Sequence, residues 1–217
     1  MIQVHDHGHV EYVNHMGNDR EVAEAAWVST ASCENRTDED VSRLIKFLAR
    51  ENHWTPFGQV NIKLRVKWPL FVARQAMRSN IGIVWNEESR RYVSHDPQFF
   101  EPDQWREKGK NIKQGSGEGV VELDAAAEYI LHNARFESLS AYHHLLKIGV
   151  APELARTVLP QSMYTECIGN FTLAALARFY NLRADSHAQK EIQDYAAAIA
   201  QIAQPLFPIS WEALTAV

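Results

Sequence analysis

The feature that most constrains the fold is a strict alternation of apolar and polar side chains between residues 59 and 68. The apolar members are Val60, Ile62, Leu64, Val66 and Trp68, and the polar ones between them are Asn61, Lys63, Arg65 and Lys67. Successive side chains of a strand point to opposite faces, so this period of two predicts a strand with one face against the core. Pro69 ends the pattern, and the chain is therefore expected to contain a sheet layer.

Several other segments carry the three-four apolar spacing of helices. The clearest covers residues 38–51, where Thr37 is the expected N-cap and Asp40 holds the acidic position of a capping box. Further helices are expected at 21–27, 71–78, 125–148, from Pro152 onward, and at about 186–203. A short strand is expected at 10–13, residues 79–92 look less regular, and the chain from residue 120 onward is expected to be mostly helical.

These elements indicate an α+β fold, with an antiparallel sheet layer near the N-terminus and long helices near the C-terminus. The 217 residues are 46% hydrophobic and 23% charged, an ordinary globular composition. No internal repeat and no interdomain linker is apparent, so a single domain over residues 1–217 is expected.

Charge and residue usage exclude several classes of protein. A net charge of −5 argues against general nucleic-acid binding. No apolar run approaches the roughly 20 residues of a membrane helix, and the start lacks a signal-peptide pattern, so a cytoplasmic protein is expected. Cys33 and Cys167 form no metal or redox spacing. His5, His7 and His9 alternate and would share one face of a strand, but no further ligand spacing supports them, and no metal site is predicted.

A basic segment stands out in this acidic chain. Between residues 63 and 91 there are seven lysines and arginines and only two acids, Glu87 and Glu88. Arginine donates two parallel hydrogen bonds and therefore suits phosphate. Residues 86–91 mix carboxylate, hydroxyl and guanidinium groups, as a ligand with a phosphate and a polar ring would require. A solvated strand face for the 63–67 cations and a surface turn at 86–91 remain alternatives.

Motifs along nearly the whole chain carry a family resemblance. They are residues 10–13, 16–19, 53–57, 69–75, 86–92, 155–160, 164–165 and 182–192. In this collinear order they resemble the flavin-dependent thymidylate synthases, which methylate deoxyuridine monophosphate (dUMP). The resemblance implies a thymidylate synthase-complementing-like fold, FAD as cofactor, NADPH and methylenetetrahydrofolate as co-substrates, and a homotetramer whose active sites are built from several subunits.

The resemblance also implies roles for particular residues. The nucleotide positions are Gln75, Glu87, Ser89, Arg90, Arg91, Arg156 and Arg183. Among them Ser89 and Arg183 are the catalytic positions, with Arg183 stabilising negative charge on the pyrimidine ring. The flavin-side positions are Ser29, His53, Thr55, Arg78, Ser79, Asn80, Ile81 and Arg178. Taken alone, Arg183 is better explained as a capping residue at the end of a helix.

The departures from the family pattern concern the cofactor side. The family's Arg-His-Arg triplet reads Arg78-Ser79-Asn80 here, with one extra residue before Ser89. Thr172 and Ala174 replace the usual Asn and Arg, and Arg178 lies close enough to compensate. The alternatives are therefore methylation of UMP, another C5 modification such as hydroxymethylation, or a homologue that binds the nucleotide without turnover. Residues 108–119 form either a lid or a plain surface loop.

Overall fold

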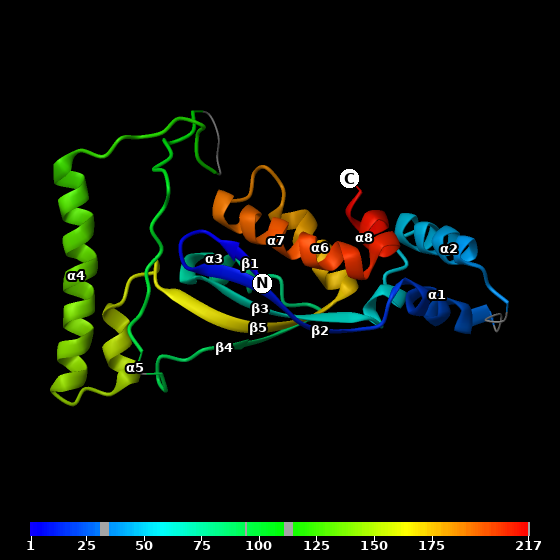
Figure 1. The fold of residues 1–217 in the computed structure, drawn as a ribbon, viewed down its shortest axis with the longest axis horizontal. Coiled ribbons are helices and arrows are strands. Elements are labelled where there is room, and N and C mark those ends of the chain that lie inside the picture. Colours follow the sequence, from blue (N-terminus) through cyan, green and yellow to red (C-terminus); the bar gives the residue numbers. More distant parts are fainter. Residues whose placement is uncertain (31–34, 94, 111–114, 217) are drawn as a thin grey trace.

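The computed structural model describes residues 1–30, 35–93, 95–110 and 115–216 (Figure 1). Within these residues one antiparallel sheet has the strand order β1-β2-β3-β5-β4. The strands are β1 (Ile2–Val4), β2 (Gly8–Met16), β3 (Asn61–Pro69), β4 (Ile83–Glu87) and β5 (Tyr164–Thr172). The alternating segment is thus confirmed as a strand, and it occupies the centre of the sheet.

The apolar face of β3 is completely covered. Ile62, Leu64, Val66 and Trp68 have no exposed surface, whereas Arg65 on the opposite face remains exposed. Arg65 is not simply solvated, because its guanidinium pairs with Glu166 of β5 at 2.7 Å and with Glu11 of β2 at 3.3 Å. The polar face therefore carries cross-strand ion pairs, which help to set the register of the sheet.

Two strands contradict the sequence prediction. Residues 164–172 lie in the part of the chain that was expected to be mostly helical but form β5, and β4 lies in a stretch that was expected to be less regular. In β5 the buried face alternates correctly, but Thr165, Cys167 and Gly169 are among its members. Small and polar residues hide the period of two, so pairing with β3 rather than local pattern decides the conformation.

The helices are α1 (Asp19–Trp27), α2 (Asp38–Arg50), α3 (Leu70–Ala76), α4 (Ala125–Lys147), α5 (Pro152–Ala155), α6 (Leu173–Arg183), α7 (Lys190–Leu206) and α8 (Pro208–Thr215). The capping box of α2 is confirmed, since Asp40 N donates to Thr37 Oγ1 and Thr37 N donates to Asp40 Oδ2. The 125–148 helix and the start at Pro152 are also confirmed.

The helix expected at 186–203 begins later, at Lys190, and a separate helix α6 precedes it. The Asp185 carboxylate accepts a hydrogen bond from His187 N at 2.7 Å, which forms a turn that separates the two helices. Arg183 is therefore in the last turn of α6.

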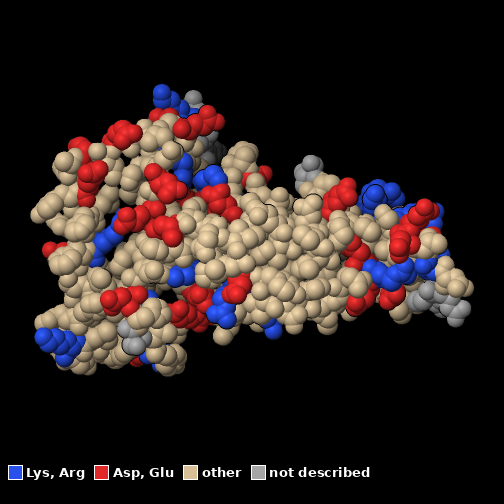
Figure 2. Space-filling view, in the orientation of Figure 1, with Lys and Arg blue, Asp and Glu red and all other residues tan. Residues whose placement is uncertain are grey.

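Figure 1 shows α3, α6, α7 and α8 covering one face of the sheet, with α1–α2 at one end and α4–α5 at the other. Charged side chains gather toward these two ends, and the middle of the same view carries few (Figure 2). In α4 only Tyr142 is buried, while Tyr129, Ile130 and Phe136 are each more than 60% exposed. No helix among the described residues has both the length and the apolar character to cross a membrane.

Asp19 connects the first helix, α1, to the last helix, α8, by hydrogen bonds. This residue at the start of α1 is 8% exposed, and its carboxylate accepts hydrogen bonds from Ile209 N at 2.8 Å and Ser210 N at 2.9 Å. The first turn of a helix leaves N–H groups without intrahelical partners and attracts negative charge. Asp19 therefore serves as the anchor for α8.

We predict that Asp19→Ala lowers the free energy of unfolding by about 2 kcal/mol, because two N–H groups lose their acceptor. Urea denaturation followed by circular dichroism at fixed protein concentration measures the change. Asp38→Ala is the matched control, since the side chain of Asp38 is 95% exposed and its ion pair is with Arg20. Equal midpoints for Asp19→Ala and the unsubstituted protein would contradict this role.

Candidate functional site

A cavity of about 600 Å³ lies between α3, the end of β4 and the segment after α5. Its charged and hydroxyl-bearing lining residues are Arg74, Glu87, Glu88, Ser89, Arg90, Arg156, Thr157, Tyr164 and Thr165. Four expected nucleotide positions, Glu87, Ser89, Arg90 and Arg156, are thus brought together although Arg156 is distant in sequence. Arg74 was counted in the basic segment but was not assigned to a site.

The end of β4 determines how the acidic and hydroxyl groups are presented. The Glu87 carboxylate accepts a hydrogen bond from Thr165 Oγ1 of β5 at 2.7 Å. Directly after β4, Glu88 N donates a hydrogen bond to Glu166 O of β5 at 2.8 Å. Arg91 N then donates to Ser89 Oγ at 3.3 Å, which stabilises a turn at the cavity edge.

The neighbouring arginines Arg90 and Arg91 have different surroundings. Arg90 is buried at 6% exposure, lines the cavity and donates to the carbonyl of His95. Arg91 points to α5, where it pairs with Glu153 at 3.0 Å, and it is not among the cavity-lining residues. Arg91 therefore tethers the short helix that leads to Arg156, and its expected role at the nucleotide stays a prediction.

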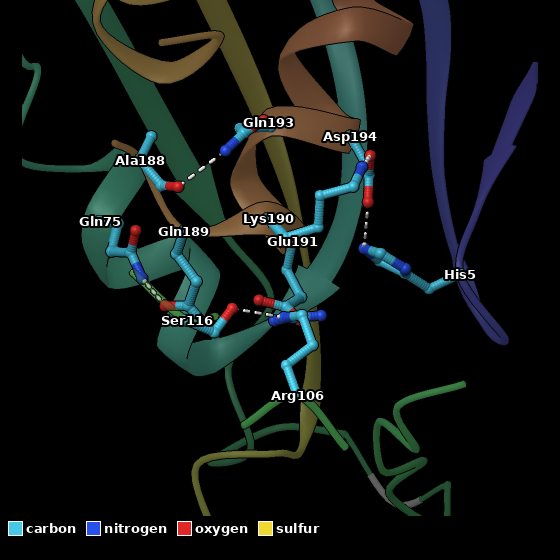
Figure 3. Close-up of polar contacts among 10 residues, drawn as sticks. All are labelled: His5, Gln75, Arg106, Ser116, Ala188, Gln189, Lys190, Glu191, Gln193 and Asp194. Atoms are coloured by element: carbon cyan, nitrogen blue, oxygen red, sulfur yellow. Dashed lines mark hydrogen bonds and ion pairs between the residues drawn. The ribbon is translucent and has the colours of Figure 1, made fainter. Parts of the chain in front are cut away.

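A second group of expected nucleotide residues lies outside this cavity. Arg183 Nη2 donates to the backbone carbonyl of Gln75 at 2.6 Å. The Gln75 side chain in turn donates from Nε2 to Gln189 Oε1 at 2.5 Å (Figure 3). Arg74 and Gln75 are adjacent in α3, yet one lines the cavity and the other contacts the loop before α7. Within one chain, the two expected catalytic residues therefore lie in separate groups: Ser89 lines the cavity, and Arg183 lies beside Gln75.

The surroundings of the Arg183 guanidinium favour a bound anion. Burial lowers its pKa, and the nearby positive charge of Arg78 lowers it further. Its Nε is buried and has no hydrogen-bond partner among the described residues. An unpaired buried donor and two neighbouring guanidiniums are both unfavourable, and a bound anion would relieve both. The group therefore fits a negatively charged ligand.

The flavin-side positions lie around the start of α6. The Arg78–Ile81 segment follows α3, and Arg178 Nη2 of α6 donates to the Ile81 carbonyl at 2.5 Å. Thr172 N, at the N-cap of α6, donates to Gly82 O at 2.9 Å, so this loop is attached to the helix start. Ser29, His53 and Thr55 are exposed; Ser29 follows α1, and the 56–58 turn after Thr55 contacts both α1 and α6.

The altered residues around α6 have local structural roles. Thr172 replaces the family's Asn, and its hydroxyl accepts a hydrogen bond from Ala175 N at 3.2 Å, capping the helix. Arg78 and Arg178 are exposed cations. Guanidinium groups suit the diphosphate of a dinucleotide cofactor, so the residues present fit FAD.

The expected absence of a metal site concerns the N-terminal histidines. His5 and His7 lie in the turn between β1 and β2, and only His9 lies in a strand. The idea that all three share one strand face is therefore wrong. The described residues contain no cluster of three or more potential metal-binding side chains. Part of the 108–119 loop, and Cys33, lie outside the described residues.

The comparisons with known proteins show the family of the chain. The family model described as thymidylate synthase complementing protein matches residues 11–209. The chain belongs to the flavin-dependent thymidylate synthase family. A flavin-dependent thymidylate synthase from Thermus thermophilus is 42% identical over 212 residues, which cover 98% of this chain and 77% of the relative. One from Kosmotoga olearia is 37% identical over 221 residues, covering 98% and 92%.

Similar solved structures extend the comparison. A UMP/dUMP methylase PolB from Streptomyces cacaoi bound with 5-Br dUMP superimposes with a TM-score of 0.85 at 30% identity, covering 99% of this chain and 97% of the other. The same methylase bound with 5-Br UMP gives a TM-score of 0.82 at 30% identity, covering 99% and 96%. The expected α+β thymidylate synthase-complementing fold is therefore confirmed.

Cys167 of β5 is predicted to be chemically inert. It is 1% exposed, and burial raises the pKa of its thiol to about 12. Since the thiolate is the reactive form, iodoacetamide at about pH 8 should leave Cys167 unmodified in the folded protein and alkylate it after unfolding in urea. Peptide mass spectrometry measures the labelling. Rapid alkylation of Cys167 in the native protein would contradict the burial described here.

Proposed function

We propose that this protein is a flavin-dependent methyltransferase that converts dUMP to dTMP. The observation that carries the proposal is the cavity in which Arg74, Arg90 and Arg156 meet Glu87 and Ser89. Cations suit a phosphate, and the carboxylate and hydroxyl suit a polar ring or sugar. The names of the relatives and the nucleotide analogues of the similar solved structures support the same ligand class.

The chain's own residues would act by positioning and electrostatics. Arg90 and Arg156 would hold the phosphate, with Glu87 and Ser89 directed to the rest of the nucleotide. Arg183, whose buried Nε lacks a partner among the described residues, would stabilise negative charge as the C5 carbon of the ring becomes nucleophilic. Ser89 is the second proposed catalytic position. Cys167 takes no part, because its thiol stays protonated near neutral pH.

The proposed cofactor is FAD, held by residues after α1, after α2, after α3 and within α6. These are Ser29, His53, Thr55, Arg78, Ser79, Asn80, Ile81 and Arg178. When bound, a reduced flavin supplies the hydride that completes the methyl group. NADPH is the proposed reductant and methylenetetrahydrofolate the proposed carbon donor. We also propose that the protein is cytoplasmic.

A homotetramer of this single 217-residue domain would complete the site. Gln75 and Arg183 would come from one subunit, and Glu87, Ser89, Arg90 and Arg156 from another. The separation of the two groups around α3 supports this arrangement. So does α4, because Tyr129, Ile130 and Phe136 leave apolar surface of the kind that subunit contacts cover.

UMP is the second candidate substrate. It is favoured by the similar methylase, which is named for both UMP and dUMP, and by the altered Arg78-Ser79-Asn80 triplet. Hydroxymethylation, or nucleotide binding without turnover, are the remaining alternatives.

The test supplies FAD, NADPH and methylenetetrahydrofolate with either dUMP or UMP and measures the product mass. We expect methylation of dUMP, with an absorbance spectrum that shows bound flavin. A hydroxymethyl product would retain an oxygen and identify the other C5 chemistry. A colourless protein that ignores added flavin, or one that binds dUMP without any product, would contradict the proposed function.

A further inference from the structure

Arg106 links the connection before α4 to the start of α7. Its own backbone is held by antiparallel contacts: Arg106 pairs with Val120, Glu107 N donates to Gly119 O at 2.8 Å, and Val121 N donates to Trp105 O at 2.6 Å. The Arg106 side chain then reaches α7, where Nη2 donates to Glu191 Oε1 at 2.5 Å (Figure 3). Its Nε donates to Ser116 Oγ at 2.7 Å.

Glu191 depends on this contact. The residue is 4% exposed, and its Oε2 is buried with no hydrogen-bond partner among the described residues. Burial by itself would raise the pKa of Glu191, but the hydrogen bond from Arg106 and other favourable contacts outweigh it, so the pKa is lowered. A buried carboxylate stays charged only when a cation compensates it, and Arg106 is the cation that contacts it.

The first turn of α7 connects this ion pair to the nucleotide residues. Gln189 is the N-cap of α7, yet its side chain does not cap the helix. Instead Gln189 Oε1 accepts a hydrogen bond from Gln75 Nε2 at 2.5 Å. The carbonyl of Gln75 holds Arg183 at 2.6 Å. Glu191 and Gln189 are two residues apart, so holding one fixes the backbone that presents the other.

We propose that Arg106 is a positioning residue for the nucleotide site. By holding Glu191 it fixes the first turn of α7, so that Gln189 orients Gln75 and, through Gln75, the guanidinium of Arg183. The proposal rests on the proposed function, because Gln75 and Arg183 matter here as nucleotide-binding residues. Arg106 itself belongs to none of the motifs that carry the family resemblance, and it touches neither of those two side chains.

The experiment measures the Kd for dUMP by calorimetry, and kcat and KM for dUMP, on the flavin-loaded full-length protein. Arg106→Ala should raise Kd and KM about tenfold, the equivalent of one lost positioning hydrogen bond. Arg106→Lys, which keeps a cation, should recover part of the loss. Lys190→Ala is the matched control, because Lys190 lies in the same turn but pairs with Asp194. The Kd of this variant for dUMP should be unchanged.

A double-mutant cycle separates positioning from general destabilisation. If Arg106 acts through Gln189, then Arg106→Ala combined with Gln189→Ala should bind dUMP no more weakly than the weaker-binding single variant. Additive losses of affinity would overturn the proposal. Should Arg106→Ala fail to fold because Glu191 is left unpaired, Arg106→Met combined with Glu191→Gln removes both charges and tests the same loss of affinity.

The outcomes distinguish the two proposals. If the unsubstituted protein binds and methylates dUMP while folded Arg106 variants bind it equally well, the positioning role is wrong and the proposed function stands. If the unsubstituted, flavin-loaded protein fails to bind dUMP, the proposed function falls, and the positioning role falls with it.

Discussion

The pairing of β3 with β5 is the contact on which the rest of the structure depends. The two strands match residue for residue from Asn61 opposite Thr172 to Pro69 opposite Tyr164. One end of the pair leads into α3, which carries Arg74 and Gln75, and the other end leads into α6, which carries Arg183. Thr165 of β5 also holds the Glu87 carboxylate. A shift in this register would therefore displace every element that contributes to the site.

The orientation of side chains on α3 explains why the expected nucleotide residues fall into two groups. α3 projects successive side chains in different directions, so Arg74 lines the cavity while Gln75 meets Gln189. Arg183 donates a hydrogen bond to the backbone carbonyl of Gln75 and therefore lies with Gln75 rather than in the cavity. Ser89 lines the cavity and Arg183 does not. The proposed assembly of subunits would complete a pocket that contains both residues.

Local periodicity predicted some parts of the fold and missed others. The alternation in β3 and the capping box of α2 are local signals, and both were confirmed. β5 was missed because Thr165, Cys167 and Gly169 carry no apolar period, and its pairing with β3 is a tertiary contact that a short window of sequence does not contain. The helix expected at about 186–203 begins later, at Lys190, because a turn held by the hydrogen bond from His187 N to Asp185 precedes it.

The site was predictable to a similar extent. The basic segment and the family motifs indicated the residue types, and one cavity is lined by Glu87, Ser89, Arg90 and Arg156. The division around α3 could not be predicted, because it depends on helix orientation. Arg106 lies in none of the sequence motifs that were considered. Its ion pair with the buried Glu191 of α7 is visible only in the structure.

The most direct test of the shared site is complementation between inactive variants. Arg156→Ala and Arg183→Ala should each abolish dUMP methylation alone, and co-expression should restore part of it, because some sites in a mixed assembly receive both intact arginines. Arg156→Ala with Ser89→Ala is the matched control and should stay inactive, since both residues would come from the same subunit. Mixed assemblies of the first pair that form but remain inactive would contradict the account.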